Sequence, residues 1–303
     1  MPMQSLIRRI ETISSPEQLL LNESMASHTT IRVGGPADAF YMPESVEQLR
    51  QSLDWARSLS VPVLLMGNGS NLIVRDGGVR GLVVALGERF SRIRVEGDEL
   101  TAQAGASLKR VSLAAQEAGL SGLEFAAGIP GTLGGGTAMN AGAYGGQLSD
   151  VLLSADVLLD GEVRTLSLEE MQMGYRTTLP LSLNCPVLSV RFRLTRGDPA
   201  AILDRMNCLN LRRRERQPLN YPSAGSVFKR PEGHFAGALI EEAGLKGLTN
   251  GGAQVSEKHA GFIINLGGAT AKEVLELMEE VRSRVFARSG VMLEPEVRIV
   301  GED

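Results

Sequence analysis

The chain has 303 residues, 43% hydrophobic and 22% charged, so it is longer than a typical single domain and lies outside the compositional class of disordered proteins. Its net charge of −4 and its 4% aromatic content argue against a nucleic-acid partner. Cys185 and Cys208 are too few for a disulfide framework, and the first residues lack the apolar core of a signal peptide. We expect a cytoplasmic protein with two structural units.

Residues 125–149 carry no charge and could be mistaken for a membrane span. Eight of them are glycine and one is proline, so the stretch lacks the dense Leu, Ile and Val content of a spanning helix. We therefore expect no membrane contact.

The sequence of the first two-thirds of the chain predicts short strands with a few helices. Residues 46–59 repeat apolar positions at helical spacing after a capping box of Ser45 and Gln48, and a second helix is expected at 108–118. Residues 61–66 form a short apolar run that is typical of a buried strand. Further strand-like runs occur at 82–86, 93–95, 151–159, 163–166 and 187–194. This pattern predicts a strand-rich α+β fold.

The last third begins with a helix opened by Asp198 and Pro199, which ends near Pro218. A longer helix is predicted at 270–289, because Thr270 and Glu273 form a capping box and an apolar stripe follows them. We place the main domain boundary near residues 196–198.

A glycine loop follows the strand at 61–66, and its residues are Gly67, Asn68, Gly69, Ser70, Asn71 and Leu72. It resembles the start of a dinucleotide fingerprint, but leucine stands where the third glycine would be and the next residues favour a strand. Such a loop can present several backbone N–H groups to a pyrophosphate. Taken alone, it is explained slightly better as a tight turn between two strands.

A second glycine-rich segment favours ligand binding over a simple turn. It runs over 128–136 and 140–146. Glycine at this density costs stability, which is best explained if the backbone must approach a ligand closely. The alternative is a run of tight turns packed against a sheet. Together the two loops predict a large phosphate-bearing cofactor held mainly by main chain. The predicted contacts in the second segment are Gly128, Ile129, Pro130, Gly131, Gly134, Gly135, Asn140 and Gly142.

At this point the chain resembles a known family, the UDP-N-acetylenolpyruvoylglucosamine reductases, in its shorter, second type. The resemblance rests on motifs that occur in family order from about Thr29 onward. They are Thr29–Ala37, Gly67–Val74, Gly122–Phe125 with Gly128–Gly146, Tyr175–Arg176, Pro222–Lys229, Ala236–Gly247, Ser256–Asn265 and Leu293–Val297.

The resemblance implies an FAD-binding domain of the vanillyl-alcohol-oxidase (PCMH) type at 30–196, after an N-terminal segment at 1–29. A smaller α+β substrate-binding domain is expected at 197–303. The family binds FAD without a covalent link and takes its hydride from NADPH, and neither glycine loop carries a histidine or cysteine. We expect a monomer whose partners are NADPH and a UDP-sugar.

The implied reaction reduces an enolpyruvyl ether to UDP-N-acetylmuramate in peptidoglycan precursor synthesis. It needs a proton donor, a cation near the substrate carboxylate and stabilisation of the developing charge. By resemblance Ser226 is the proton donor, Arg176 the catalytic arginine and Glu296 the catalytic glutamate. Without the family motif, Ser226 would be interpreted as a turn hydroxyl and Arg176 as a solvated surface residue.

Substrate binding is assigned to Lys229, Arg214 and Tyr175. Arg214 belongs to a basic cluster that also contains Arg212, Arg213 and Arg216, and one or two of these are expected to reach the diphosphate of UDP or FAD. Glu294 is expected to be structural. Arg230 stands where the family often has asparagine, which puts the detail of substrate binding in doubt.

The three histidines and two cysteines show no metal-ligand spacing, so no metal site is expected. Two other functions are compatible with the glycine loops. One is a different flavoenzyme of the same fold, which would have no reason to carry the motifs around Ser226 and Glu296. The other is a non-catalytic nucleotide-binding protein, which would bind no flavin.

Overall fold

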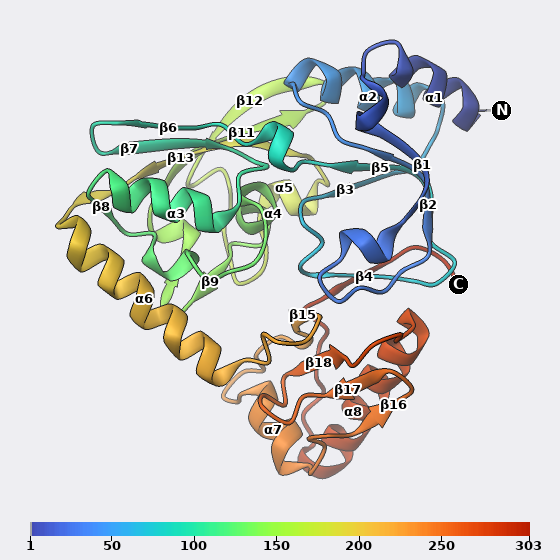
Figure 1. The fold of residues 1–303 in the computed structure, drawn as a ribbon, viewed down its shortest axis with the longest axis vertical. Coiled ribbons are helices and arrows are strands. Elements are labelled where there is room, and N and C mark those ends of the chain that lie inside the picture. Colours follow the sequence, from blue (N-terminus) through green and yellow to red (C-terminus); the bar gives the residue numbers. More distant parts are fainter. Residues whose placement is uncertain (1) are drawn as a thin grey trace. The chain divides into compact units, whose positions relative to one another are not determined.

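The computed structural model describes residues 2–303, and its elements are labelled in Figure 1. The chain forms two compact units that interleave in sequence. The first contains residues up to 21, 39–68 and 81–213, and the second contains residues 22–38, 69–80 and 214–303. The predicted segments 1–29, 30–196 and 197–303 divide the chain differently, and their status as domains stays a prediction.

A four-stranded sheet, most of whose residues belong to the first unit, has the order β1 (Leu19–Ser24), β2 (Pro36–Tyr41), β5 (Val79–Ala85) and β3 (Val63–Met66). Strands β3 and β5 are parallel. Helices α1 (Pro2–Glu11) and α2 (Val46–Ser58) share a hydrophobic cluster with this sheet. Ser45 caps α2 through the N–H of Gln48, as the sequence predicts.

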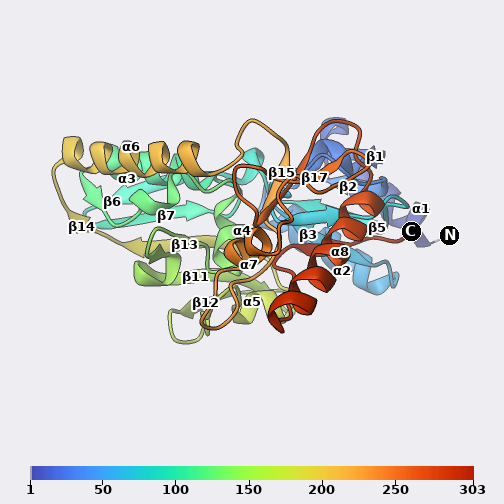
Figure 2. The same ribbon diagram turned by 90° about the horizontal axis from the view of Figure 1, so that it is seen from below.

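A five-stranded antiparallel sheet follows in the same unit. Its order is β12 (Glu162–Ser167), β11 (Leu152–Leu159), β13 (Val187–Arg193), β7 (Glu99–Gln103) and β6 (Ile93–Glu96). Buried side chains of β11, β13 and β7 form one cluster with helix α3 (Leu108–Glu117). Helix α6 (Pro199–Arg216) runs alongside α3 in both views (Figures 1 and 2).

Shorter elements complete the first unit. Helices α4 (Leu133–Ala138) and α5 (Leu179–Ser182) occur with the two-residue strand pairs β9 (Gly142–Ala143) with β10 (Gly146–Gln147) and β8 (Leu120–Ser121) with β14 (Thr195–Arg196). Short 3₁₀ helices of this unit occur at Pro16–Gln18, Glu88–Phe90, Glu124–Ala126 and Leu148–Asp150, and another at Met25–His28 belongs to the second unit.

The second unit has an antiparallel sheet in the order β15 (Ser223–Ser226), β18 (Phe262–Asn265), β17 (Ala253–Val255) and β16 (Thr249–Asn250). Helices α7 (Ala236–Glu242) and α8 (Ala271–Ser289) share one hydrophobic core with it, and Figure 2 shows both helices. A parallel pair of β4 (Leu72–Val74) and β19 (Arg298–Val300) also lies in this unit.

The N-terminus of α8 is capped from two sources. Thr270 and Glu273 form the predicted capping box. In addition, the two carboxylate oxygens of Asp76 accept the N–H groups of Ala271 and Lys272 at 2.8 and 2.9 Å. Since Asp76 follows β4, these bonds join the loop after that strand to the longest helix of the unit.

We predict that Asp76→Ala lowers the free energy of unfolding by about 1–2 kcal/mol, because two helix-terminal N–H groups lose their acceptor. Urea denaturation followed by circular dichroism measures the change. Asp204→Ala, an exposed aspartate on α6, is the control and should be neutral. Equal stability of the Asp76 and Asp204 variants would show that solvent replaces the cap.

Candidate active site

The first glycine loop connects β3 to β4, so a strand and not a helix follows it. A Cβ at Gly67 would overlap Oγ1 of Thr132, which starts helix α4. Glycine at this position therefore lets the first loop touch the second inside the first unit. Gly67 and Asn68 belong to this unit, whereas Gly69, Ser70, Asn71 and Leu72 belong to the second.

The second glycine segment is packed tightly at several positions. Leu133 and Gly134 donate their N–H groups to the carbonyls of Ala106 and Ala104 at 2.7 and 2.8 Å, and a Cβ at Gly134 would lie 2.7 Å from the Cβ of Ala104. Gly135 is different, since it is exposed and a Cβ there would meet only the Thr132 side chain within 4 Å. Which of these glycines touches a cofactor stays a prediction.

The remaining predicted positions of this segment surround helix α4. Residues 128–131 form the turn before it, whereas Asn140 follows the helix and Gly142 begins β9. Ile129 donates its N–H to the carbonyl of Ala126, and Gly131 accepts from Leu108. The backbone here is therefore held by the protein's own hydrogen bonds.

Asn140 anchors the end of that segment. Its buried side chain donates to the carbonyl of Gly174 at 3.1 Å and accepts from the N–H of Ser149 at 3.1 Å. Its own carbonyl accepts from Arg176 at 3.3 Å. The structure thus brings the predicted cofactor residue Asn140 and the predicted catalytic residue Arg176 into contact within the first unit.

Arg176 lies in a tight turn with an unusual backbone. Gly174 donates its N–H to the carbonyl of Thr177, and Arg176 between them has a φ of 57°. A long side chain in the left-handed region is strained, and such strain concentrates at functional sites. The guanidinium carbon lies 5.2 Å from the ring centre of Tyr175. The turn therefore presents both predicted residues together.

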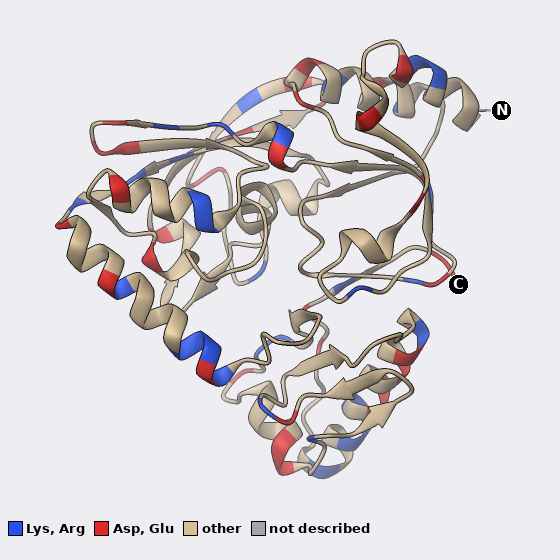
Figure 3. Ribbon diagram, in the orientation of Figure 1, with Lys and Arg blue, Asp and Glu red and all other residues tan. Residues whose placement is uncertain are grey.

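Arg213, whose role the sequence left open, borders the second glycine segment. A Cβ at Gly128 would lie 2.5 Å from Oδ1 of Asn210 and 3.2 Å from Cδ of Arg213. Burial lowers the pKa of the Arg213 guanidinium, and its Nε is buried with no hydrogen-bond partner among the described residues. Arginines gather at the C-terminal end of α6 (Figure 3). A buried donor beside the loop is suited to an anionic group.

In the second unit, the strand that carries Ser226 pairs with the segment that carries Glu296. Glu296 donates its N–H to the carbonyl of Val227 at 2.9 Å, and Lys229 donates to the carbonyl of Glu294 at 2.8 Å. Phe228 and Pro295 lie opposite each other between these bonds. Glu296 therefore lies opposite Val227, the residue that follows Ser226, and both Ser226 and Glu296 are half-buried.

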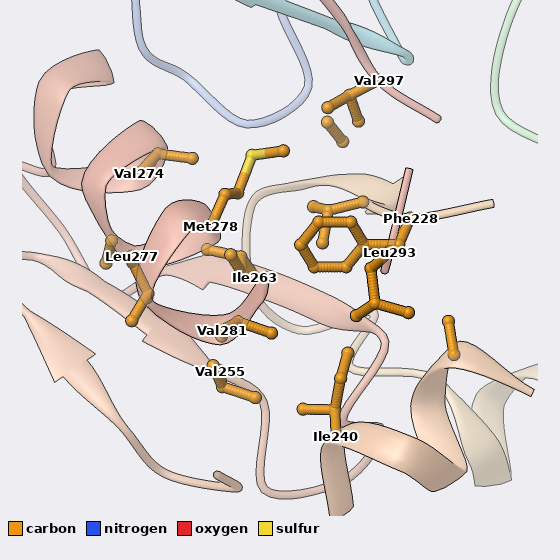
Figure 4. Close-up of a cluster of buried hydrophobic side chains, with 14 of the residues drawn as sticks. Phe228, Ile240, Val255, Ile263, Val274, Leu277, Met278, Val281, Leu293 and Val297 are labelled. Atoms are coloured by element: carbon orange, nitrogen blue, oxygen red, sulfur yellow. The ribbon is translucent and has the colours of Figure 1, made fainter. Parts of the chain in front are cut away.

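The hydrophobic core holds both the Ser226 segment and the Glu296 segment in place. Phe228, Leu293 and Val297 belong to the same buried cluster, and Figure 4 shows them together with side chains of α8. Because these residues are 0–4% exposed, the chain on either side of Ser226 and Glu296 has little freedom to move.

Asn71 forms a further hydrogen bond to the Glu296 main chain. Its side-chain amide donates to the carbonyl of Glu296 at 3.0 Å, and its own carbonyl accepts from Arg298 at 2.9 Å. Asn71 was predicted to contact a cofactor, and this bond to the Glu296 main chain was not foreseen. Both the N–H and the carbonyl of Glu296 are consequently hydrogen bonded.

Charged groups complete this part of the second unit. Lys229 forms an ion pair with Glu294 at 3.3 Å, which gives Glu294 a structural partner. Arg230 lies 4.0 Å from the ring centre of Phe235. Arg214, near the end of α6, accepts a hydrogen bond on its carbonyl from Nζ of Lys258. Over residues 2–303, no group of three potential metal ligands occurs and no helix is long and apolar enough to cross a membrane.

Comparison with known proteins agrees with this arrangement. Residues 217–300 match the family described as UDP-N-acetylenolpyruvoylglucosamine reductase, C-terminal domain, and residues 37–167 match the FAD binding domain family. The chain is 49% identical over 290 residues to the UDP-N-acetylenolpyruvoylglucosamine reductase of Alkaliphilus oremlandii, covering 95% of both chains. It is 50% identical over 287 residues to that of Pediococcus pentosaceus, covering 94% of this chain and 95% of the relative.

A solved structure shows the same likeness in three dimensions. The crystal structure of UDP-N-acetylenolpyruvylglucosamine reductase from Thermus caldophilus matches with a TM-score of 0.80 and 38% identity, over 93% of this chain and 97% of that one. The expected fold class, α+β with a PCMH-type FAD-binding domain and a reductase C-terminal domain, is confirmed.

We predict that Gly67→Ala weakens FAD retention by tenfold or more, because the new methyl group would overlap Thr132 and push the two loops apart. Gly87→Ala is the matched control, since a Cβ there would meet nothing within 4 Å. The flavin-to-protein absorbance ratio after dialysis measures retention. Equal ratios for the two variants would contradict a role of the Gly67 contact in cofactor binding.

Proposed function

Since the chain belongs to the UDP-N-acetylenolpyruvoylglucosamine reductase family and is therefore an oxidoreductase, we propose that it reduces UDP-N-acetylenolpyruvoylglucosamine to UDP-N-acetylmuramate. The proposal includes NADPH as hydride donor, non-covalent FAD and a cytoplasmic place in peptidoglycan precursor synthesis. The observation that supports it most directly is the main-chain bond that places Glu296 opposite Val227, the residue after Ser226.

FAD fits the residues of the first unit. The loops at Gly67 and Thr132 are in contact, which suits a ligand held by backbone groups. The unpartnered Nε of Arg213 beside Gly128 would bind a phosphate oxygen. When bound, the flavin supplies hydride transfer to the enolpyruvyl double bond.

The protein's own groups handle the proton and the charge. We assign to Ser226 the donation of a proton from Oγ to the carbon next to the substrate carboxylate. Glu296 holds a proton against that carboxylate, which reduces repulsion between the two acids as negative charge develops. The main-chain bond between Glu296 and Val227 fixes the backbone that carries both groups.

Arg176 is assigned to the substrate carboxylate. Its planar fork can bind both oxygens and stays charged throughout the reaction. The turn holds the side chain against Asn140 and Tyr175, so little conformational freedom is lost when substrate binds. Lys229 supplies further positive charge in the second unit and Tyr175 further contact in the first.

The proposed function is tested by a visible spectrum of the purified holoenzyme under anaerobic conditions. NADPH should bleach the flavin, and UDP-N-acetylenolpyruvoylglucosamine should restore its colour. A flavin that bleaches but is not reoxidised would show that the substrate is a different one. A flavin that NADPH leaves oxidised would overturn the assigned hydride donor.

We predict that Ser226→Ala is still reduced by NADPH but is reoxidised by substrate roughly 10²–10⁴-fold more slowly, since a positioned acid contributes about that much. Stopped-flow absorbance separates the two half-reactions. Ser223→Ala, on the same strand, is the control and should react at the normal rate. Unchanged reoxidation of the Ser226 variant would remove this hydroxyl from the mechanism.

Arg176→Lys should lower kcat/KM for the enolpyruvyl substrate by roughly 10²-fold, because an ammonium cannot bind a carboxylate in the bidentate geometry. Steady-state kinetics with varied substrate measure this. The matched control is Arg164→Lys, an exposed arginine on β12 whose replacement should have no effect. Equal kcat/KM values for the two variants would show that Arg176 is a surface residue without a role in substrate binding.

A further inference from the structure

The side chain of Asn140 is enclosed by the protein's own hydrogen bonds. It is 2% exposed, and its Oδ1 accepts the N–H of Ser149 at 3.1 Å. Its Nδ2 has three acceptors, which are the carbonyl of Gly174 at 3.1 Å, Oγ of Ser149 at 3.3 Å and Oε1 of Gln147 at 3.4 Å. An amide nitrogen carries only two hydrogens, so a ligand that used this donor would have to displace one of these acceptors. The geometry therefore points to a role for the side chain inside the protein.

The bonds of Asn140 hold the turn that carries Arg176. This turn runs from Gly174 to Thr177, which lie opposite each other, and the N–H of Gly174 donates to the carbonyl of Thr177 at 2.9 Å. Asn140 bonds the carbonyl of Gly174 through its side chain, and its own carbonyl accepts from Nη1 of Arg176 at 3.3 Å. One residue thus contacts both the backbone of the turn and the guanidinium that the turn presents.

Thr178 holds the other end of the same turn. Its buried hydroxyl donates to the carbonyl of Ala138 at 2.8 Å and accepts the N–H of Leu181 in helix α5. Helices α4 and α5 are neighbours within the first unit (Figure 1). The turn is therefore fastened at Ala138, the last residue of α4, on one side and at Asn140 on the other.

Backbone conformation limits which residue can make these contacts. Asn140 has a φ of 42°, in the left-handed region where asparagine, aspartate and glycine are tolerated best. Asparagine alone among these three carries both an acceptor and a donor on its side chain, as the bonds to Ser149 and Gly174 require. Aspartate would keep the acceptor without the donor, and glycine would keep only the backbone.

We propose that Asn140 is a positioning residue for Arg176, which fixes the turn so that the guanidinium is oriented before the substrate carboxylate arrives. Ordering a long side chain during binding lowers affinity, and a misplacement of about 1 Å can slow a reaction by about 10²-fold. Asn140 belongs to the second glycine segment, so the stretch of backbone proposed to hold FAD also orients the arginine. The role in the reaction rests on the proposed function, whereas the hold of Asn140 on the turn does not.

Hydrogen exchange of the FAD-loaded enzyme, measured by mass spectrometry on peptides that cover residues 172–178, tests this hold. Asn140→Gly keeps the left-handed backbone and the carbonyl that Arg176 contacts, and Asn140→Asp removes only the donor. Both should exchange about tenfold faster in this turn than the wild type, because the local opening becomes easier. Their flavin-to-protein absorbance ratio should be unchanged. Asn184→Gly, an exposed asparagine with a φ of 50°, is the matched control and should exchange normally.

Unchanged exchange in both Asn140 variants would overturn the proposal, because the turn would then be held without this side chain. Loss of FAD from either variant would also overturn it, since the side chain would then serve the cofactor.

Steady-state kinetics test the link to Arg176. Asn140→Gly should lower kcat/KM for the enolpyruvyl substrate by about tenfold in the wild type, but by less than about twofold when added to Arg176→Lys, because two residues that act through one group are not additive. An unchanged kcat/KM, or a loss of the same size in both backgrounds, would show that Asn140 does not act through Arg176. Failure of the reductase proposal looks different, because substrate would reoxidise the flavin of neither the wild type nor the variants. Exchange would still separate Asn140→Gly from Asn184→Gly.

Discussion

In the second unit, both main-chain polar groups of Glu296 are hydrogen bonded. Val227 accepts its N–H, and the side chain of Asn71 donates to its carbonyl. Main-chain bonds of this kind set distances without using the side chains that the chemistry needs. The carboxylate of Glu296 and the hydroxyl of Ser226 can therefore serve the substrate while their backbone stays fixed.

Close packing of glycine serves the first unit in a comparable way. At Gly67 and Gly134 the backbone of one segment occupies the space where another residue would have its Cβ. This brings the loop before β4 against the start of α4 and lets main chain, rather than long side chains, face a ligand. The conformational entropy that glycine loses on folding is the cost of such contact.

Local signals predicted much of the fold, and non-local contacts account for what they missed. Helices α2, α3, α6 and α8 lie where apolar spacing and capping residues placed them. The bond between Asn71 and Glu296 joins residues 225 positions apart, and no local pattern records it. The short strands β16 to β18 were also missed, because they acquire their stability from the sheet and the core. Only the family motifs indicated that Ser226 and Glu296 belong together.

Arg213 and Gln217 each carry a buried polar atom without a hydrogen-bond partner among residues 2–303, which the sequence pattern does not reveal. The sequence presents Arg213 as one of four arginines in a cluster, with nothing to separate it from its neighbours. Burial separates it, since its Nε lacks a partner beside the glycine segment while Arg214 and Arg216 are exposed. Gln217, four residues later, carries the complementary defect, an acceptor without a donor. Under the proposed function a phosphate group of FAD satisfies the Arg213 donor, so burial rather than sequence pattern singles out this arginine for the cofactor.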